Sequence, residues 1–194
     1  MSTLEQIKKL REKTGAGVVD VKKAFEDAGG DEAKAVEFLR KRGQEKAGKK
    51  AGRSAGEGVV VSYIHSNRKV GAIVKLLCET DFVARNVEFQ ELAQDIAMHI
   101  TAMNPKYLNP QDVPAEVLEK EKEIWMAQLA REGKPKNILA EIIKGKEKKL
   151  RDDLALLTQP FVKNPEVTVA ELISEKIGKI GENIQVGGFY RMEL

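Results

Sequence analysis

The sequence predicts an α+β protein built from a small three-helix N-terminal domain, a linker, and a core in which helices pack on a three-stranded antiparallel sheet. Helical periodicity near the N-terminus, a pair of β-rich runs around a polar turn, and a third β-rich run at the C-terminus support this class. We place the domain in residues 1–43, the basic linker in residues 44–57 and the core in residues 58–194. With 194 residues, 42% of them hydrophobic, the chain can bury one core and a small satellite.

The N-terminal domain reads as three short helices. Apolar residues share one helical face over residues 4–10, and a glycine-containing break follows at residues 14–17. Residues 18–28 repeat the helical spacing, a glycine pair supplies a left-handed exit, and Asp31 is a suitable N-cap for the third helix. Because Val18 and Val19 are adjacent, they cannot both point into one small core, and at least one should be exposed.

The linker carries much of the positive charge of the chain. Residues 1–55 hold 14 Lys and Arg against 9 Asp and Glu, and a basic run extends through residues 40–53. The run contains no aromatic side chain that could stack on a base, so a solvated surface is favoured over a nucleic-acid patch. Gly48, Gly52 and Gly56, and the lack of an apolar stripe, indicate that the linker is helical at most in part.

The core begins with a predicted β-hairpin. Residues 58–64 and 70–78 are rich in β-branched and apolar residues, and the polar residues 65–69 between them are typical of a turn. Residues 184–192 can add a third strand. These strands form one layer, which needs a second layer of helices to bury its apolar face.

Four helical segments are expected to supply that layer. The first runs from Phe82 to Met103 and the second over residues 114–132. The third, residues 135–157, is strongly charged and should lie across the surface. Thr168 and Glu171 form a capping box at the start of the last one.

The junction between the second strand and the first core helix places an aromatic side chain at a corner. Thr80 and Asp81 are both good N-cap residues, because a short side-chain oxygen can accept from the free N–H groups of the first helical turn. Phe82 and Val83 would then be the first helical residues. Phe82 could be a staple folded into the core, which is the commoner case, or a wedge that protrudes toward a partner. The local pattern alone does not choose between them.

No pattern of residues supports enzyme chemistry. His65 and His99 lack the spacing and neighbouring carboxylates of a metal site, so we expect them to be structural or solvated. Cys78 is the only cysteine, which excludes an intrachain disulfide, and its place at a strand end indicates a buried thiol. There is no phosphate-binding loop, and residues 15–17 lack the third glycine of a dinucleotide loop. We expect no catalytic residue, no bound metal, no cofactor and no direct nucleotide binding.

Membrane and secretion signals are also missing from the pattern. No apolar run approaches the ~18 residues that suggest a membrane span. The first eleven residues carry charges where a signal peptide needs an apolar stretch. The expected location is the cytoplasm, without membrane contact.

Three motifs in the chain point to a known family. Residues 80–84 read Thr-Asp-Phe-Val-Ala, residues 10–24 join the first two predicted helices, and residues 159–163 are followed by Ile-Gly-Glu-Asn-Ile at 180–184. Together they resemble the motifs of the elongation factor Ts family, the guanine-nucleotide exchange factors of the GTPase elongation factor Tu, and they occur in the family order. The resemblance implies a UBA-like N-terminal domain and a role in translation elongation without covalent chemistry.

The resemblance also implies two sites for contact with elongation factor Tu. One enters the GTPase domain and disturbs its Mg²⁺ site, and the other docks the N-terminal domain on that same GTPase domain. The positions that correspond to Mg²⁺ dislocation are Thr80, Asp81, Phe82 and Val83, and those that correspond to the N-terminal contact are Arg11, Val18 and Val19.

Assembly and one departure from the family follow from the same comparison. Longer family members contain two related core halves, whereas this chain has one hairpin and one C-terminal strand, so the resemblance implies a homodimer.

At Gly187 and Gly188 the family usually carries a basic pair. Because glycines weaken a strand, we expect arginines at these positions to stiffen it, provided that both backbones have ordinary β conformations.

Two other classes of function remain open from the residues alone. A basic RNA- or ribosome-associated protein without exchange activity would account for the basic run, and its binding would weaken steeply with salt. A structural helical adaptor would account for the charged helices and the missing active site. Nucleic acid is the less favoured partner, because the basic run lacks aromatic residues.

Overall fold

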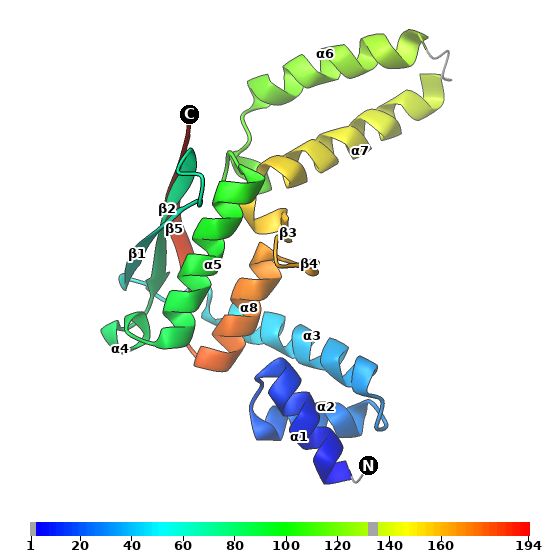
Figure 1. The fold of residues 1–194 in the computed structure, drawn as a ribbon. Helices are drawn as coiled ribbons and strands as arrows, with labels where there is room; N and C mark the ends of the chain where they lie inside the picture. Colours follow the sequence, from blue (N-terminus) through cyan, green and yellow to red (C-terminus); the bar gives the residue numbers. More distant parts are fainter. Residues whose placement is uncertain (1–2, 132–135) are drawn as a thin grey trace.

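Three helices form the N-terminal part of the chain (Figure 1). The computed structural model describes residues 3–131 and 136–194. The predicted cap of the third helix is confirmed, since the Asp31 carboxylate accepts from the N–H groups of Ala33 and Lys34 at 2.9 and 3.1 Å. These helices are α1, Thr3–Thr14, α2, Val18–Asp27, and α3, Glu32–Lys50. They enclose a small core of Leu10, Val21, Ala24, Phe25 and Ala35.

α3 extends into the residues expected to form the linker. It continues to Lys50, so only residues 51–56 connect it to the sheet. Ala47 is buried against the larger core, and the Lys46 ammonium lies 2.7 Å from the Asp20 carboxylate of α2. The basic segment is therefore helical up to Lys50, with α3 in contact with both the main core and α2, and only residues 51–56 are coil.

The predicted three-stranded antiparallel sheet is confirmed. Its order is β1-β2-β5, with Val61 of β1 opposite Val74 of β2, and Val74 opposite Phe189 of β5. The pairing brings the C-terminal strand beside the hairpin although more than a hundred residues separate them along the chain. The strands are β1, Glu57–Ile64, β2, Val70–Cys78, and β5, Gln185–Glu193.

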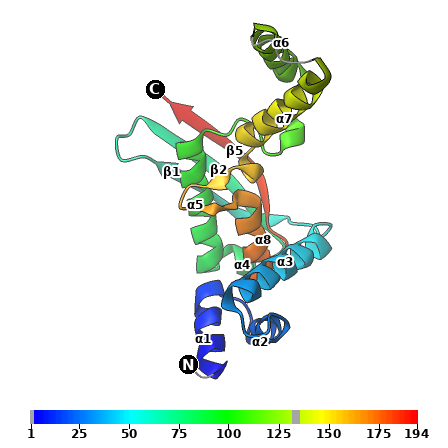
Figure 2. The ribbon, with the colours of Figure 1, turned by 90° about the vertical axis from the view of Figure 1, so that its right-hand side faces the viewer.

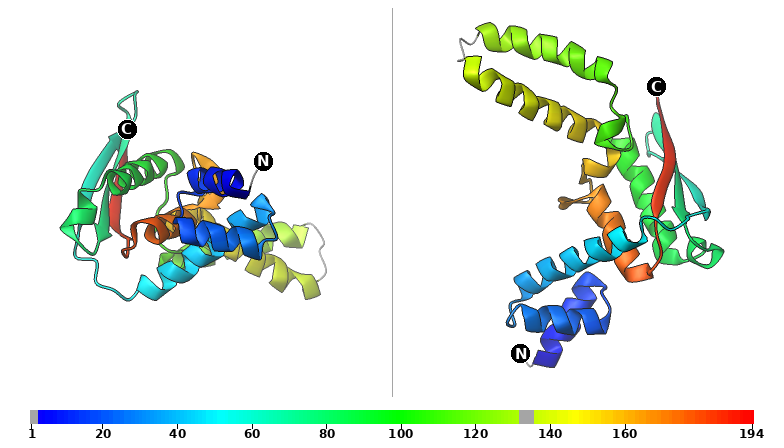
Figure 3. Two further views of the ribbon diagram at one scale, coloured as in Figure 1. Left: turned by 90° about the horizontal axis from the view of Figure 1, so that it is seen from below. Right: turned by 180° about the vertical axis from the view of Figure 1, so that it is seen from behind.

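The two faces of the sheet differ in what covers them. α5, Val87–Met103, lies on one face and α8, Val169–Ile180, packs beside α5 (Figure 1). Strand residues that point to that side are buried in β2 and partly buried in β1, whereas the next residues along each strand point away. On the other face, which no described helix covers (Figure 3), the exposed apolar side chains are Val60, Ile64, Ile73, Tyr190 and Met192.

The single helix predicted from Phe82 to Met103 is wrong, because the structure has two helices there. α4, Asp81–Ala84, is one turn long, and Arg85 and Asn86 interrupt the helix before α5 begins. Asn86 causes the break, since its side chain accepts from the Glu88 N–H at 2.8 Å and caps a new helix. The apolar stripe of α5 therefore does not continue into α4.

The charged segment predicted to lie across the surface instead projects from it. α6, Ala115–Arg131, and α7, Lys136–Leu154, run side by side as a helical hairpin away from the sheet (Figures 1 and 2). Lys122 pairs with Glu147 at 2.9 Å, and the Lys146 ammonium lies 5.8 Å from the centre of the Trp125 ring. The expected boundaries at residues 132 and 135 fall outside the described residues.

Among the described residues, no helix combines the length and the apolar character that a membrane crossing requires. α7 illustrates the reason, because Lys and Arg recur through its second half.

A 3-10 turn, Leu156–Thr158, follows α7 before the chain returns to the core.

A small hairpin that the sequence did not predict follows this turn. It consists of β3, Pro160–Phe161, and β4, Asn164–Thr168. His99 of α5 is fully buried against it: its Nε2 lies 3.0 Å from Gln159 Oε1, and its Nδ1 accepts the Val162 N–H at 3.2 Å. His99 is therefore a structural residue, and burial lowers the pKa of its imidazole.

Gly187 and Gly188 form a β-bulge in β5. Leu76 pairs with Val186 and Lys75 with Gly188, so Gly187 is the extra residue of the bulge. A Cβ at Gly187 would lie 2.6 Å from Lys75 Cε, and Gly188 has a φ of +148°. A side chain at Gly188 would therefore be strained, and one at Gly187 would displace Lys75, so the condition of ordinary β backbones under which arginines should stiffen this strand is not met.

Candidate functional site

Phe82 stands on the surface at the corner where β2 meets α4. Its side chain is 80% exposed, so the core-staple interpretation is wrong. The residues that anchor the turn are its neighbours: Ala84 is buried, and Val83 packs against the main core. A large, solvent-exposed aromatic side chain is suited to bind a partner when, as here, its turn is anchored by packing on the core.

The turn is fixed by a network of polar contacts as well as by packing. Of the two predicted cap residues, Thr80 is the N-cap of α4, so Asp81 and not Phe82 is the first helical residue. Thr80 Oγ1 accepts the Val83 N–H at 3.4 Å. The same hydroxyl donates to Glu182 Oε1 at 2.7 Å. Glu182 Oε2 accepts the N–H groups of Glu79 and Thr80, each at 3.0 Å.

The Glu79 carboxylate makes the return contact. Glu79 Oε1 accepts the Asn183 N–H at 2.7 Å, and its Oε2 lies 3.5 Å from the Arg53 guanidinium. The Asn183 N–H, followed by Arg53, holds the pKa of Glu79 below its ordinary value. The Asn183 side chain donates to the Arg53 carbonyl at 2.8 Å. The β2–α4 corner, the turn after α8 and the end of the linker are thus joined.

Asp81 carries the charge that lies next to Phe82. Its carboxylate lies 2.9 Å from the Arg85 guanidinium one helical turn later; the Arg85 side chain is exposed and that of Asp81 is about half exposed. Such an exposed pair contributes little to stability. Asp81 can therefore exchange Arg85 for another partner at small cost.

The three N-terminal candidates lie on two helices, and all three are exposed. Arg11 is exposed on α1, and Val18 and Val19 begin α2 with 52% and 80% of their side chains exposed. Both valines are exposed, where at least one was expected. The N-terminal group and α4 both lie at the end of the molecule opposite the α6–α7 hairpin, with α3 and α8 between them (Figure 1).

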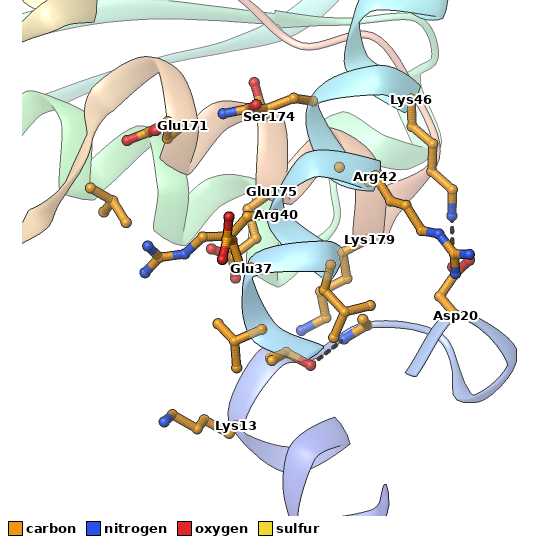
Figure 4. A pocket seen from close by; sticks show the side chains of 18 of the residues that line it. Lys13, Asp20, Glu37, Arg40, Arg42, Lys46, Glu171, Ser174, Glu175 and Lys179 are labelled. Carbon is orange, nitrogen blue, oxygen red and sulfur yellow. Dashed lines mark hydrogen bonds and ion pairs between the residues drawn. The ribbon is translucent and has the colours of Figure 1, made fainter. Parts of the chain in front are cut away.

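A cavity of about 540 Å³ lies between the α1–α2 turn, α3 and α8 (Figure 4). Its wall carries charges of both signs, including Arg40, Glu37 and Glu175, and the Lys46–Asp20 pair lies at one side. It lacks the uniformly basic lining that a phosphate or nucleic acid would require. Over the described ranges, no three His, Cys, Asp or Glu side chains are grouped to hold a metal ion.

Most cations of the basic run are engaged within the chain. Arg42 pairs with Asp27 at 3.1 Å, Lys41 with Glu37 at 2.8 Å, and Lys50 donates to the Gly181 carbonyl. Lys46 and Arg53 are paired as described above. This run therefore offers fewer free charges to phosphates than its sequence implies.

Sequence reasoning missed Glu182, Glu79 and Asn183, which hold the corner in place. The only signal available was the motif at residues 180–184, which carried the family resemblance without a stated role. Glu182 lies 102 residues from Thr80, so no local pattern could connect them.

A family model and three similar curated proteins all carry the same description. The family model described as Elongation factor TS matches residues 45–194. The chain is 52% identical over 194 residues to a protein named Elongation factor Ts from Carboxydothermus hydrogenoformans, covering 100% of this chain and 89% of that one. It is 51% identical over 194 residues to the protein of that name from Thermosipho melanesiensis, covering 100% and 99%. For Pseudothermotoga lettingae the identity is 53% over 192 residues, with 99% and 97% covered.

Proposed function

This chain belongs to the elongation factor Ts family of translation elongation factors, and we propose that it promotes GDP release from elongation factor Tu as a guanine-nucleotide exchange factor. The observation that carries the proposal is the 80% exposed Phe82 on a capped and anchored turn. The factor works in the cytoplasm through protein contacts, without covalent chemistry.

The mechanism acts on the metal of the partner. Mg²⁺ neutralises the phosphate oxygens of a bound nucleotide, so disturbing its coordination weakens the nucleotide without direct contact. Phe82 enters the GTPase domain as the wedge, with Asp81 beside it, while Thr80 and Val83 hold the turn. Binding linkage makes the effect reciprocal, so GDP weakens the factor by the ratio in which the factor weakens GDP.

A second contact orients the wedge. Arg11, Val18 and Val19 present one charged and two apolar side chains on the N-terminal helices. They dock on the same GTPase domain, and the valines supply apolar contact of short reach. The helix α3 supports this division, because it packs in both cores, through Ala35 in the small one and Ala47 in the larger one.

The uncovered sheet face supports a symmetric homodimer. Val60, Ile73, Tyr190 and Met192 form an apolar band across all three strands on the side opposite α5. A second copy of this face would bury the band and supply the missing core half. Light scattering should report twice the chain mass of 21.5 kDa. The variant Tyr190→Lys places a charge in the apolar band and should lower the reported mass toward that of a single chain. A single-chain mass for the unaltered protein would contradict the dimer.

The direct test of exchange is release of fluorescently labelled GDP from elongation factor Tu. Adding the protein should accelerate release when Mg²⁺ is present. Chelating Mg²⁺ should accelerate release by itself and remove most of the further gain, because both treatments act on one site. An RNA-associated protein or a helical adaptor would leave release unchanged under either condition.

A further inference from the structure

α4 cannot hold its own conformation. It is four residues long, and a helical segment of one turn is unstable alone because nucleation fixes several residues for one hydrogen bond. Phe82 contributes little packing, since it is 80% exposed. The position of its ring therefore depends on the packing of Val83 and Ala84 below the turn and on polar contacts made by the residues just before it.

Those contacts converge on one carboxylate. Glu182 follows Gly181, the left-handed C-cap that ends α8, and so faces the corner. It accepts three hydrogen bonds, from the N–H groups of Glu79 and Thr80 and from the Thr80 hydroxyl. Because the hydroxyl proton points to Glu182, the remaining lone pairs of Thr80 Oγ1 can accept the Val83 N–H. Glu182 thereby sets the direction of the helix cap itself.

The turn that carries Glu182 is itself held in place. Asn183 donates through its backbone to Glu79 and through its side chain to the Arg53 carbonyl. Lys50 donates to the Gly181 carbonyl, and Gln185 donates to the Ala51 carbonyl at 3.3 Å. The end of α3, the turn after α8 and the β2–α4 corner form one connected unit.

We infer that Glu182 is a positioning residue for nucleotide exchange, which orients the Phe82 wedge through Thr80 without touching the partner. The inference rests on the proposed function of Phe82 and extends it to a residue 100 positions away in the chain. It assigns the turn at residues 181–183 the task of holding the wedge in its binding geometry before the partner arrives.

The test uses the full chain and the isosteric variant Glu182→Gln. The glutamine amide keeps one acceptor oxygen and replaces the other with an NH₂ group, so it cannot accept both the two backbone N–H groups and the Thr80 proton, and any bond that remains is no longer charge-assisted. The matched control is Glu171→Gln, because the Glu171 carboxylate accepts from the Thr168 N–H and hydroxyl in a similar arrangement at the start of α8. Both variants should lose comparable thermal stability.

The first readout needs no partner. Hydrogen exchange at the Glu79 and Thr80 amides should accelerate about tenfold in Glu182→Gln, the effect of losing roughly one charge-assisted hydrogen bond. Glu171→Gln should leave both amides unchanged. Unchanged protection of these amides in Glu182→Gln would overturn the inference, whatever the activity of the protein.

The second readout is GDP release at saturating protein. Glu182→Gln should slow it about tenfold in the parent protein and add nothing in a Phe82→Ala background, because an effect that acts through Phe82 disappears with it. Equal slowing in both backgrounds would overturn the inference. Normal release by Phe82→Ala alone would instead refute the proposed wedge, and the amide measurement would still decide whether Glu182 positions the corner.

Discussion

Two phenylalanines on successive helices are placed in opposite environments. Phe82 on α4 is 80% exposed, whereas Phe89 on α5 is fully buried. The capping residue Asn86 lies between them and starts a new helix, so the apolar face of α5 does not reach α4. α5 is held by apolar packing along its length, whereas α4 is held by Val83 and Ala84 and by the polar contacts of Thr80. Stability should therefore depend on α5 and partner binding on α4.

The largest expected effect is the loss of stability when the buried Phe89 is truncated. Phe89→Ala should lower the free energy of unfolding by about 3–5 kcal/mol, since it leaves a cavity in the main core. Chemical denaturation measures this change. GDP release, normalised to the folded fraction, should stay near the parent value. A large loss of release per folded molecule would show that the two helices are not separable.

The next largest effect on stability is expected at the glycine bulge of β5, in the sheet that α5 covers. Replacing Gly187 and Gly188 by Arg should lower the free energy of unfolding by about 1–3 kcal/mol, because one site is crowded and the other has a positive φ. The matched control is Gly48→Ala in α3, where a Cβ meets nothing within 4 Å, and it should stabilise the protein slightly. A double arginine variant as stable as the parent would show that the bulge relaxes without strain.

The buried histidine of α5 should make stability depend on pH. Burial lowers the pKa of His99, so the unfolded chain takes up a proton at a higher pH than the folded protein does. The free energy of unfolding should therefore fall as pH drops below the ordinary histidine range, and level off below the pKa of the folded state. Denaturation series at several pH values measure this slope.

The control for that series is the exposed His65 in the β1–β2 turn. His65→Gln should keep the slope and His99→Gln should reduce it. An unchanged slope in His99→Gln would assign the pH dependence to other groups and remove His99 from the stability argument.

The smallest effect on stability belongs to α4. Asp81→Ala and Arg85→Ala each break the same exposed ion pair, so each should cost at most about 0.5 kcal/mol. Only Asp81→Ala should also slow GDP release, because Asp81 lies beside Phe82, the proposed wedge. Equal release by the two variants would exclude a role for Asp81 beyond its pair with Arg85.

The sequence was sufficient where structure follows local periodicity. The β1–β2 hairpin, the third strand and the caps at Asp31 and Thr168 were predicted, because each depends on neighbouring residues. The break at Asn86 was missed, since its apolar neighbours continue a helical spacing while its own side chain starts a new cap. Capping by asparagine was the signal that could have revealed it.

The candidate site was predictable only in part for a similar reason. The resemblance pointed to Phe82, but its exposure depends on how α4 packs on the core, which the local pattern left open. The residues that hold the corner, Glu182 and Asn183, approach it from the other end of the chain. Likewise, the projection of the α6–α7 hairpin depends on helix pairing rather than on composition.

The most direct test of the account compares the melting temperature with the GDP release rate for Phe82→Ala. The melting temperature should barely change, because the ring is exposed. Binding to elongation factor Tu should weaken by about 2 kcal/mol, as expected for an interface anchor, and GDP release should slow greatly. A destabilised variant whose folded fraction still exchanges GDP at the parent rate would contradict the wedge and the division between α4 and α5.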